Sequence, residues 1–473
     1  IGGNYLNSGT FLHNSGTTSF NGASTQNISG TLINNSAFNN LELRTNSGTK
    51  NILSHASTTN FFVYAQSPVS IGSNIALSVT GNYWLNPALS PTGSIIGNNG
   101  TILFDGANQQ LIGPAMASSN NDFTNVRFSG SGTKTFSDNA STTGYFIIDS
   151  NVTVVAPSAL SVGGDYTQNG FFTDNSGTVI FNGAAQTLAG TMNTGATDFA
   201  NVEFTGAGNK TFSANASTTA LTVTAGTLIV SGRLLTIGGT FTQNSALTTN
   251  GTSKLYFSGS GNIAGTLTNG NALGDVDILA SRTLSNNAST TNLTITSGTL
   301  TASVLLSVSG NFSSSGTLSP GSGTVYFTAT GGGQSIPSAT YNNLTLLNTS
   351  GTDTATGALT VNGTMTTTSG GTLDMSTFQL LGTITPANNG TITTANTTNP
   401  AIPASKDWTG TTGAVIFAVT SGGQSVPAGT YKTLTMSNTS GTQTAVGALT
   451  VNGTLTTTSG GTLDMSTFQL LGT

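Results

Sequence analysis

The chain has 473 residues and a formal net charge of -5, and only 5% of its residues are charged. Four small residue types, Gly, Thr, Ser and Asn, make up more than half of it. An ordinary soluble domain carries roughly 25% charged residues, so the acids and bases of a typical enzyme are scarce here. The chain also has no cluster of Lys or Arg that would bind nucleic acid, and no cysteine to form disulfides or ligate a metal.

The ends of the chain and its apolar segments say little about its compartment. No apolar run reaches the roughly 18 residues that a membrane helix needs, so we expect no transmembrane segment. Ile1 opens the chain without a signal peptide, which we interpret as a processed or trimmed start. Low charge combined with frequent Val, Ile, Leu and Phe argues against disorder.

An internal repeat is marked by strands that end in phenylalanine, from SGTTSF near the start to GAVIF near the end. These residues are Phe20, Phe104, Phe181, Phe257, Phe327 and Phe417. A second aromatic or apolar position follows 14 to 19 residues later, at Phe38, Phe123, Phe199, Leu273, Tyr341 and Tyr431. The motif ASTT recurs at Ala56, Ala140, Ala216 and Ala288. Six degenerate units of about 80 residues therefore fill the chain.

The last two units are nearly identical. Residues 357–383 return at 447–473 with a single change, from Met365 to Leu455. We therefore predict two regions: four diverged units in residues 1–320, and two near-identical units in residues 321–473.

A finer rhythm runs within each unit. In residues 220–241 the pairs Leu221/Val223, Leu228/Val230 and Leu235/Ile237 recur every seven residues. Alternation within a pair indicates a strand with one buried face, and the glycine-containing pairs between them supply corners. Three such sides give about 21 residues per turn, so the pattern predicts an all-β coil, a β-solenoid of roughly 22 turns.

Tandem Ig-like β-sandwiches are the alternative architecture, because a unit of this length with many short strands also fits one such domain. The seven-residue rhythm and the variable unit lengths disfavour it. Only two tryptophans, Trp84 and Trp408, are available to anchor six cores.

The two histidines do not suggest catalysis. His55 stands before ASTT, where other units carry Asn139, Asn215 and Asn287, so we interpret it as a variant of a structural position. His13 lies in an Asn/Ser-rich stretch that we expect to be a solvated turn.

The acidic residues are scattered, with one close pair. Asp275 and Asp277 would face the same side of a strand, which leaves a cation site as an alternative to a structural role. The equivalent positions in the other units do not keep this pair. Asp374 and Asp464 are equivalent residues of the duplicated segment, and we interpret them as turn residues. We therefore predict no catalytic, cofactor-binding or metal-binding residues.

Four aromatic residues interrupt the rhythm and are the candidates for ligand binding on the outer face. They are Tyr64, Tyr83, Trp84 and Trp408. Their other explanation is packing under a loop or at a bend.

The phrases GTVIFNGAAQTLAG, GALTVNG and GGTLDMSTFQLLG resemble those of bacterial β-strand-repeat surface proteins, which include autotransporter passenger regions and filamentous-haemagglutinin-type adhesins. The resemblance spans essentially the whole chain. It lies in the style of the sequence, its composition and its repeat period, and includes no functional motif. It implies a right-handed parallel β-helix, secretion, and a place at the cell surface.

These observations lead us to expect a non-catalytic structural protein of a bacterial extracellular fibre, sheath or surface layer. We expect a fragment of a longer repetitive chain that assembles head-to-tail without cofactors. An adhesin that binds carbohydrate or another cell surface is the alternative. Polysaccharide lyases and glycosidases also use parallel β-helices, but 25 charged residues over the whole chain rarely gather the carboxylates of such a site.

Overall fold

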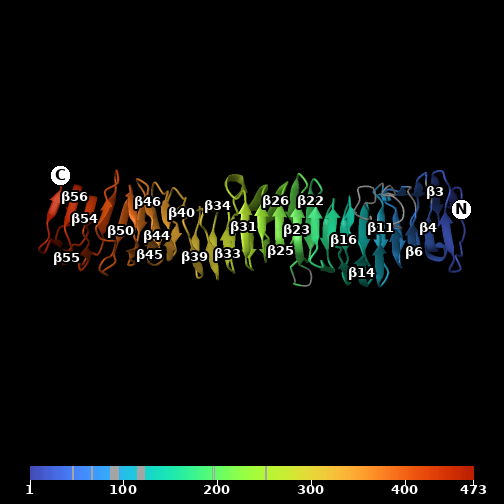
Figure 1. The fold of residues 1–473 in the computed structure, drawn as a ribbon, viewed down its shortest axis with the longest axis horizontal. Helices are drawn as coiled ribbons and strands as arrows, with labels where there is room; N and C mark the ends of the chain where they lie inside the picture. The colour runs from blue at the N-terminus through green and yellow to red at the C-terminus, as the bar shows by residue number, and fades with distance from the viewer. Residues whose placement is uncertain are drawn as a thin grey trace. The chain divides into compact units, whose positions relative to one another are not determined.

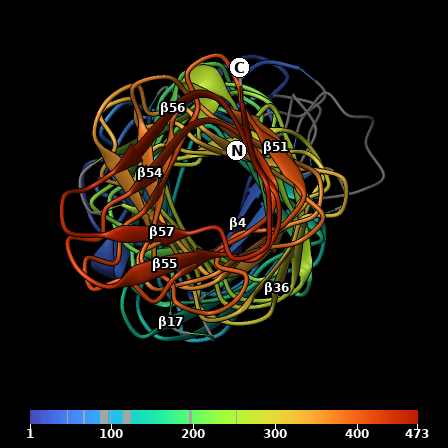
Figure 2. The ribbon, with the colours of Figure 1, turned by 90° about the vertical axis from the view of Figure 1, so that its left-hand side faces the viewer.

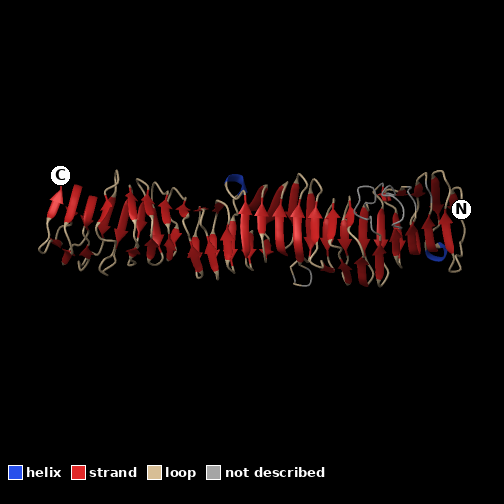
Figure 3. Ribbon diagram, in the orientation of Figure 1, coloured by secondary structure: helices blue, strands red, loops and turns tan. Residues whose placement is uncertain are grey.

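The structure is a computed structural model that describes residues 1–44, 47–64, 68–85, 95–97, 99–113, 123–193, 195, 198–250 and 253–472. The chain divides into two compact units. Unit 1 comprises residues 1–238 and 243–253, and unit 2 comprises residues 239–242 and 254–473. Strands account for nearly all regular structure (Figure 3). Within the described ranges the only helical segments are two 3-10 turns, η1 (Asn34–Ser36) and η2 (Asn269–Asn271).

Successive turns of unit 1 stack through parallel strand pairing. Strand β2 (Thr17–Phe20) pairs with β4 (Phe38–Leu43), and β4 pairs with β6 (Ala56–Val63). Strand β6 in turn pairs with β9 (Tyr83–Leu85). Figure 1 labels β4 and β6 near the N-terminus. Each pairing joins residues about one turn apart in sequence. Every strand of this column is therefore covered by the next turn of the chain.

Unit 2 repeats this architecture. Strand β30 (Lys254–Phe257) pairs with β32 (Asp275–Ile278), then β35 (Leu293–Ile295) and β38 (Phe312–Ser314) follow, all in parallel. Figure 2 faces the last turns of this unit and shows the chain circling an interior. Apolar side chains fill this interior. Together the two units hold about 22 turns. The predicted parallel β-helix is confirmed, and parallel pairing between turns excludes tandem antiparallel sandwiches.

Alternating side chains build the core. Strand β26 (Thr227–Ser231) alternates between half-buried and buried positions, and Leu228 and Val230 point inward. All six landmark phenylalanines and all six residues of the second landmark are at most 3% exposed. The sequence repeat therefore marks the inward face, as period-2 patterning predicts.

The repeat and the turn have different lengths. Phe104 lies in a column that continues through Phe128, Ile148 and Gln168 to Gly190. Phe181, the next landmark, belongs to the preceding side of the coil, in β21 (Thr178–Phe181). One repeat of unit 1 thus falls one side short of four turns, so equivalent residues of successive repeats face neighbouring sides.

Close stacking fixes glycine at some corners. At Gly30, where φ is 97°, an added Cβ would lie 2.1 Å from the carbonyl oxygen of Asn7. At the equivalent Gly190, where φ is 100°, it would lie 2.0 Å from the carbonyl oxygen of Gln168. Both the positive φ and the close backbone of the previous turn exclude a larger residue there.

The compact units do not divide at residue 320, where we placed the boundary between diverged and near-identical repeats. That boundary marks how far the copies have diverged, whereas the division near residue 250 follows the contacts within the fold. Strand pairing continues across residue 320, since β37 (Leu305–Val308) pairs with β40 (Thr324–Phe327).

Candidate functional site

Two of the four candidate ligand-binding aromatics lie in the core. Tyr83 is 1% exposed, and its ring lies 5.5 Å from that of Phe123 and 5.7 Å from that of Phe61. Burial also raises the pKa of the Tyr83 hydroxyl. Trp408, in β51 (Lys406–Trp408), is likewise 1% exposed. Neither side chain is available on the outer face, so their assignment as ligand-binding residues is corrected to core packing.

Trp84 and Tyr64 lie on the outer face, where they join Phe62 in a ladder. The rings of Phe62 and Trp84 stack at 5.9 Å, and those of Phe62 and Tyr64 stack at 6.1 Å. The guanidinium of Arg44 lies 4.1 Å from the centre of the Tyr64 ring and forms an ion pair of 2.7 Å with Glu42. The outer ladder therefore consists of Glu42, Arg44, Phe62, Tyr64 and Trp84.

The geometry of the outer ladder favours packing over ligand binding. Interplanar angles of 19° and 25° mean that the rings present faces to one another and edges to solvent. Arg44 occupies one face of Tyr64. A sugar stacks on an open aromatic face, and these contacts cover several of the faces. Trp84, which is 44% exposed, is the member most open to solvent.

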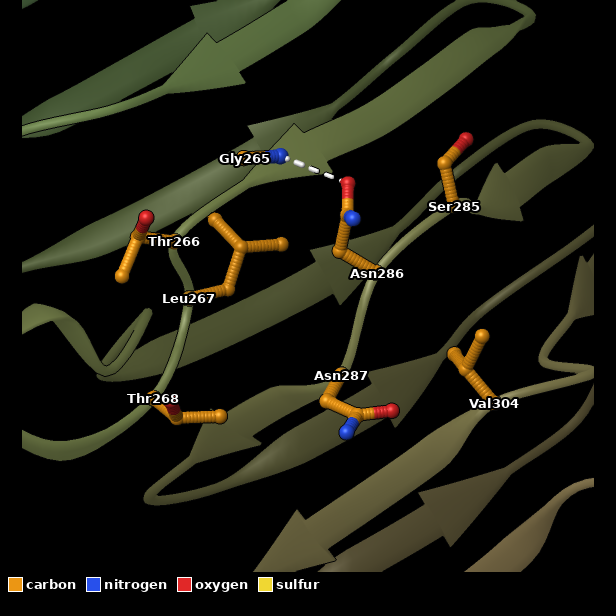
Figure 4. A pocket seen from close by; sticks show the side chains of 8 residues that line it. All are labelled: Gly265, Thr266, Leu267, Thr268, Ser285, Asn286, Asn287 and Val304. Atoms are coloured by element: carbon orange, nitrogen blue, oxygen red, sulfur yellow. Dashed lines mark hydrogen bonds between the residues drawn. The ribbon is translucent and has the colours of Figure 1, made fainter.

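A separate cleft of about 400 Å³ lies at a corner of unit 2 (Figure 4). Three successive turns line it: Gly265–Thr268 from the first, Ser285–Asn287 from the second, and Val304 from the third. The 3-10 turn η2 directly follows the first segment. Except for Leu267 and Val304, the lining side chains end in hydroxyl or amide groups or are absent at Gly265.

Two backbone contacts orient the amides of the cleft. Asn286 Oδ1 accepts the N–H of Gly265 at 2.9 Å, and Asn287 Oδ1 accepts the N–H of Leu305 at 3.1 Å. Neither Nδ2 group donates to another described residue, and the hydroxyl-bearing residues Thr266, Thr268 and Ser285 also line the cleft. The lining contains no acid or base, so the cleft can hold an uncharged polar ligand but offers no general acid or base for catalysis.

Sequence reasoning missed a recurring buried glutamine. In five repeats its Oε1 accepts a backbone N–H shortly after the landmark phenylalanine, and its Nε2 donates to two carbonyls of the preceding turn. These residues are Gln26, Gln109, Gln186, Gln334 and Gln424. Each is at most 3% exposed. The glutamine thus ties two turns together at a corner. The F-x₄₋₆-Q spacing of these repeats could have revealed it.

One turn after each glutamine position lies a second buried polar residue. Gln26 pairs with Lys50, Gln109 with Lys134, and Gln186 with Lys210. The remaining repeats place Arg282, Asp353 and Gln443 there. All six are at most 2% exposed. We call this the inner position.

The lysines at the inner position are bound by backbone carbonyls. Lys50 Nζ donates to Gly22, Lys134 Nζ to Gly106, and Lys210 Nζ to Gly183. Burial lowers the pKa of each of these ammonium groups below its usual value, and it lowers the pKa of Arg282 to about 10. These side chains have a structural role, because their N–H groups donate to backbone carbonyls.

Both histidines take structural places. His55 Nδ1 accepts the N–H of Ala76 at 3.1 Å, the same bond that Asn287 makes to Leu305 and Asn215 makes to Leu234. The interpretation of His55 as a variant of this asparagine is confirmed. His13 is half-buried and directly precedes the turn at residues 14–15, rather than being fully solvated, and its Nδ1 accepts the N–H of Ser15.

The predicted acidic residues also make structural bonds. Asp275 and Asp277 do face one side of β32, but each accepts a hydrogen bond from the next turn, from Asn292 Nδ2 and Thr296 Oγ1. Asp374 accepts the N–H of Ser376 two residues on, which confirms a turn role. Across the described ranges, no group of three or more His, Cys, Asp or Glu side chains is placed to hold a metal.

Comparison with known proteins gave no match to a family model, to a curated protein or to a solved structure. No helix among the described residues is long and apolar enough to cross a membrane.

Proposed function

We propose that this protein is a structural component of a bacterial extracellular fibre, sheath or surface layer. The proposal rests on the location of the few basic side chains. Four of the ten basic side chains are buried at the inner position, where they donate to backbone carbonyls. A binding or catalytic protein would present such polar groups to solvent. Here they form hydrogen bonds that connect one turn to the next.

The repeat architecture supports assembly into longer structures. A solenoid turn contacts only its neighbours, so its stability does not depend on total length. Any uncovered end turn presents unpaired strand edges, on which a second copy can continue the stack and form an open filament. We therefore include head-to-tail self-association in the proposal.

Immunogold electron microscopy on cells of the source organism tests the location. Antibodies raised against the purified chain should label surface fibres or a sheath. Labelling confined to the cell interior would contradict the proposal.

Electron microscopy of the purified chain at increasing concentration tests assembly separately. Filaments should lengthen as the concentration rises. Discrete particles of constant length at every concentration would remove self-association from the proposal and leave the structural role to the localisation experiment.

The cleft supports a second candidate function, an adhesin that binds carbohydrate. Its oriented amide donors and three hydroxyls suit the hydroxyl groups of a sugar, and its volume of about 400 Å³ falls within the range of small-ligand sites. The corresponding corner of the first repeat carries Ile33 and Leu53, which are 39% and 46% exposed. The polar lining of this cleft therefore differs from that corner of the first repeat.

Glycan-array binding of matched variants tests the second function. Asn286→Leu and Thr268→Val should abolish any signal, because they remove donors from the cleft. Trp408→Phe should retain it, because Trp408 is buried. A signal that survives both cleft variants and is lost in Trp84→Ala would move the site to the outer ladder.

A further inference from the structure

The inner position supplies a hydrogen-bond donor to one recurring acceptor. That acceptor is the carbonyl two residues after the landmark phenylalanine, in Gly22, Gly106, Gly183 and Val419. The donors are Lys50, Lys134, Lys210 and Gln443, respectively. Three ammonium groups and one amide thus serve the same carbonyl position.

The fifth repeat reverses this chemistry. Its landmark is Phe327, and the equivalent carbonyl belongs to Ala329. The residue at its inner position is Asp353, whose ionised carboxylate can only accept hydrogen bonds. Asp353 is 0% exposed. Its Oδ1 accepts the N–H of Gln334 at 3.0 Å, whereas its Oδ2 is buried without a hydrogen-bond partner among the described residues.

The sixth repeat shows which oxygen atoms lie next to the inner position. There Gln443 Nε2 donates to the carbonyls of Phe417 and Val419 and to Gln424 Oε1. The equivalent oxygens of the fifth repeat belong to Phe327, Ala329 and Gln334. From this equivalence we expect the same three oxygens beside the Asp353 carboxylate, where the other repeats bring in a donor. An aspartate side chain is also one methylene shorter than glutamine, so it reaches less far towards those acceptors.

A buried carboxylate among acceptors needs a positive partner. The effective cost of burying an unpaired ion is several kcal/mol, and three repeats meet the same carbonyl with an ammonium. Carboxylate and carbonyl oxygens are the ligands of hard cations. We propose that Asp353, with the carbonyl of Ala329 and Oε1 of Gln334, forms a binding site for a hard metal cation, Ca²⁺ or Na⁺, that replaces the lysine ammonium of the other repeats.

Protonation of Asp353 is the competing solution. Burial raises the pKa of this carboxyl, and the hydrogen bond from the Gln334 N–H opposes that rise. A protonated Oδ2 would donate to one of the same carbonyls, and no cation would be needed. The two solutions differ in what they bind, so metal content and salt dependence distinguish them.

The site is fully buried, so binding is coupled to folding, and the test refolds the full chain from urea. Refolding is done with Ca²⁺, with Na⁺, or with choline chloride and a chelator. We expect one tightly held ion per chain by mass spectrometry of metals, and a Tm higher by roughly 2–6 °C than in choline. The cation that produces both effects is the one the site selects.

Two reciprocal variants provide the controls. Asp353→Gln installs the residue of the sixth repeat, and it should fold equally well, bind no ion and lose the salt dependence. Gln443→Asp should raise the content to two ions per chain. Hydrogen exchange of residues 327–336 and 350–356 gives a local readout, since only these segments should become more protected on cation binding in the wild-type chain.

The proposal fails under either of two outcomes. In the first, the wild-type chain holds no ion, and its stability changes with pH but not with Ca²⁺ or Na⁺, which would establish a protonated Asp353. In the second, Asp353→Gln holds the same ion with the same salt dependence, which would place the ion elsewhere.

Discussion

Backbone carbonyls at the corners offset part of the cost of burying lysine ammonium groups in this protein. Lys210 Nζ donates to the carbonyls of Gly183, Ala184 and Gly206, which provides one acceptor for each N–H. An ammonium that is fully hydrogen-bonded avoids most of the penalty of an unsatisfied buried charge. The flexible four-carbon stem meanwhile packs as apolar volume.

The pKa shifts of these lysines predict a pH-dependent stability. Burial lowers the folded-state pKa of Lys134 below the value of 10.5 for an exposed lysine. The unfolded chain therefore binds more protons, and stability rises as the pH increases through the folded pKa towards 10.5. Urea unfolding at increasing pH up to about pH 9, below the ordinary tyrosine pKa of about 10, should show this rise.

Variants at Lys134 separate its charge from its hydrogen bond. Lys134→Gln removes the titrating group but keeps a donor for the Gly106 carbonyl, as Gln443 does for Val419. It should reduce the rise of stability with pH by about a third, since Lys50 and Lys210 remain. Lys134→Met should reduce the rise equally and also cost about 1–3 kcal/mol for the unpaired carbonyl. An unchanged pH profile in both variants would show that Lys134 is not shifted.

Trp408 offers a second test at the scale of one side chain. Its indole Nε1 is buried with no hydrogen-bond partner within the described part of the chain. Trp408→Phe removes this donor along with some apolar area, so stability should change by less than about 1 kcal/mol. Trp408→Ala should cost about 3–5 kcal/mol through the cavity it leaves. Equal losses in the two variants by urea unfolding would mean that the indole N–H has a partner.

At the scale of a strand, alternation explains which aromatic predictions were wrong. Tyr83 and Trp84 are consecutive residues of β9, so their side chains must point to opposite faces. Both could not lie on the outer surface, and the structure places Tyr83 inward and Trp84 outward. The sequence alone could have decided this pair once a strand was assigned through it.

The hydrogen bond shared by the corners before the ASTT motifs leads to a prediction for His55. Its Nδ1 accepts the Ala76 N–H, and Asn139 accepts the Ala159 N–H in the same way. His55→Asn should therefore change the free energy of unfolding by less than about 0.5 kcal/mol, and His55→Ala should cost about 0.5–1.5 kcal/mol, the net contribution of one hydrogen bond. Thermal unfolding of the three proteins measures this order. A stable His55→Ala variant would contradict a bonding role for this corner.

The strands and the core could be predicted from the sequence, but the inner position was not. Alternating apolar pairs have one physical explanation, a half-buried strand, and all six landmark phenylalanines are buried as that pattern requires. A lysine in a Ser/Gly-rich stretch such as SGTK can be either exposed to solvent or buried, and exposure is far more common. Only alignment of the repeats shows Lys50, Lys134 and Lys210 sharing a slot with Asp353 and Gln443.

At the scale of the units, the mismatch between repeat and turn spreads equivalent surfaces around the coil. Phe327 lies in a column with Leu346 and Thr367, whereas Phe417 lies in a neighbouring column with Thr394. The two near-identical repeats of unit 2 therefore present the same residues on different sides. Equivalent outer residues do not line up into one flat face along the unit, which favours a coil that is similar from all sides.

The duplicated segment provides a test of how the coil is stabilised. Leu380 and Leu470 are the same residue of the two copies, but Leu380 is 0% exposed beneath the following turn, whereas Leu470 is 47% exposed in the last turn of this chain. If each turn is stabilised by the turn that covers it, Leu380→Ala should cost about 2–5 kcal/mol and Leu470→Ala less than about 1 kcal/mol. Hydrogen exchange localises each effect, because Leu380→Ala should open only the neighbouring turns. Equal costs, or a loss of protection throughout unit 2, would show that the turns do not act as nearest-neighbour units.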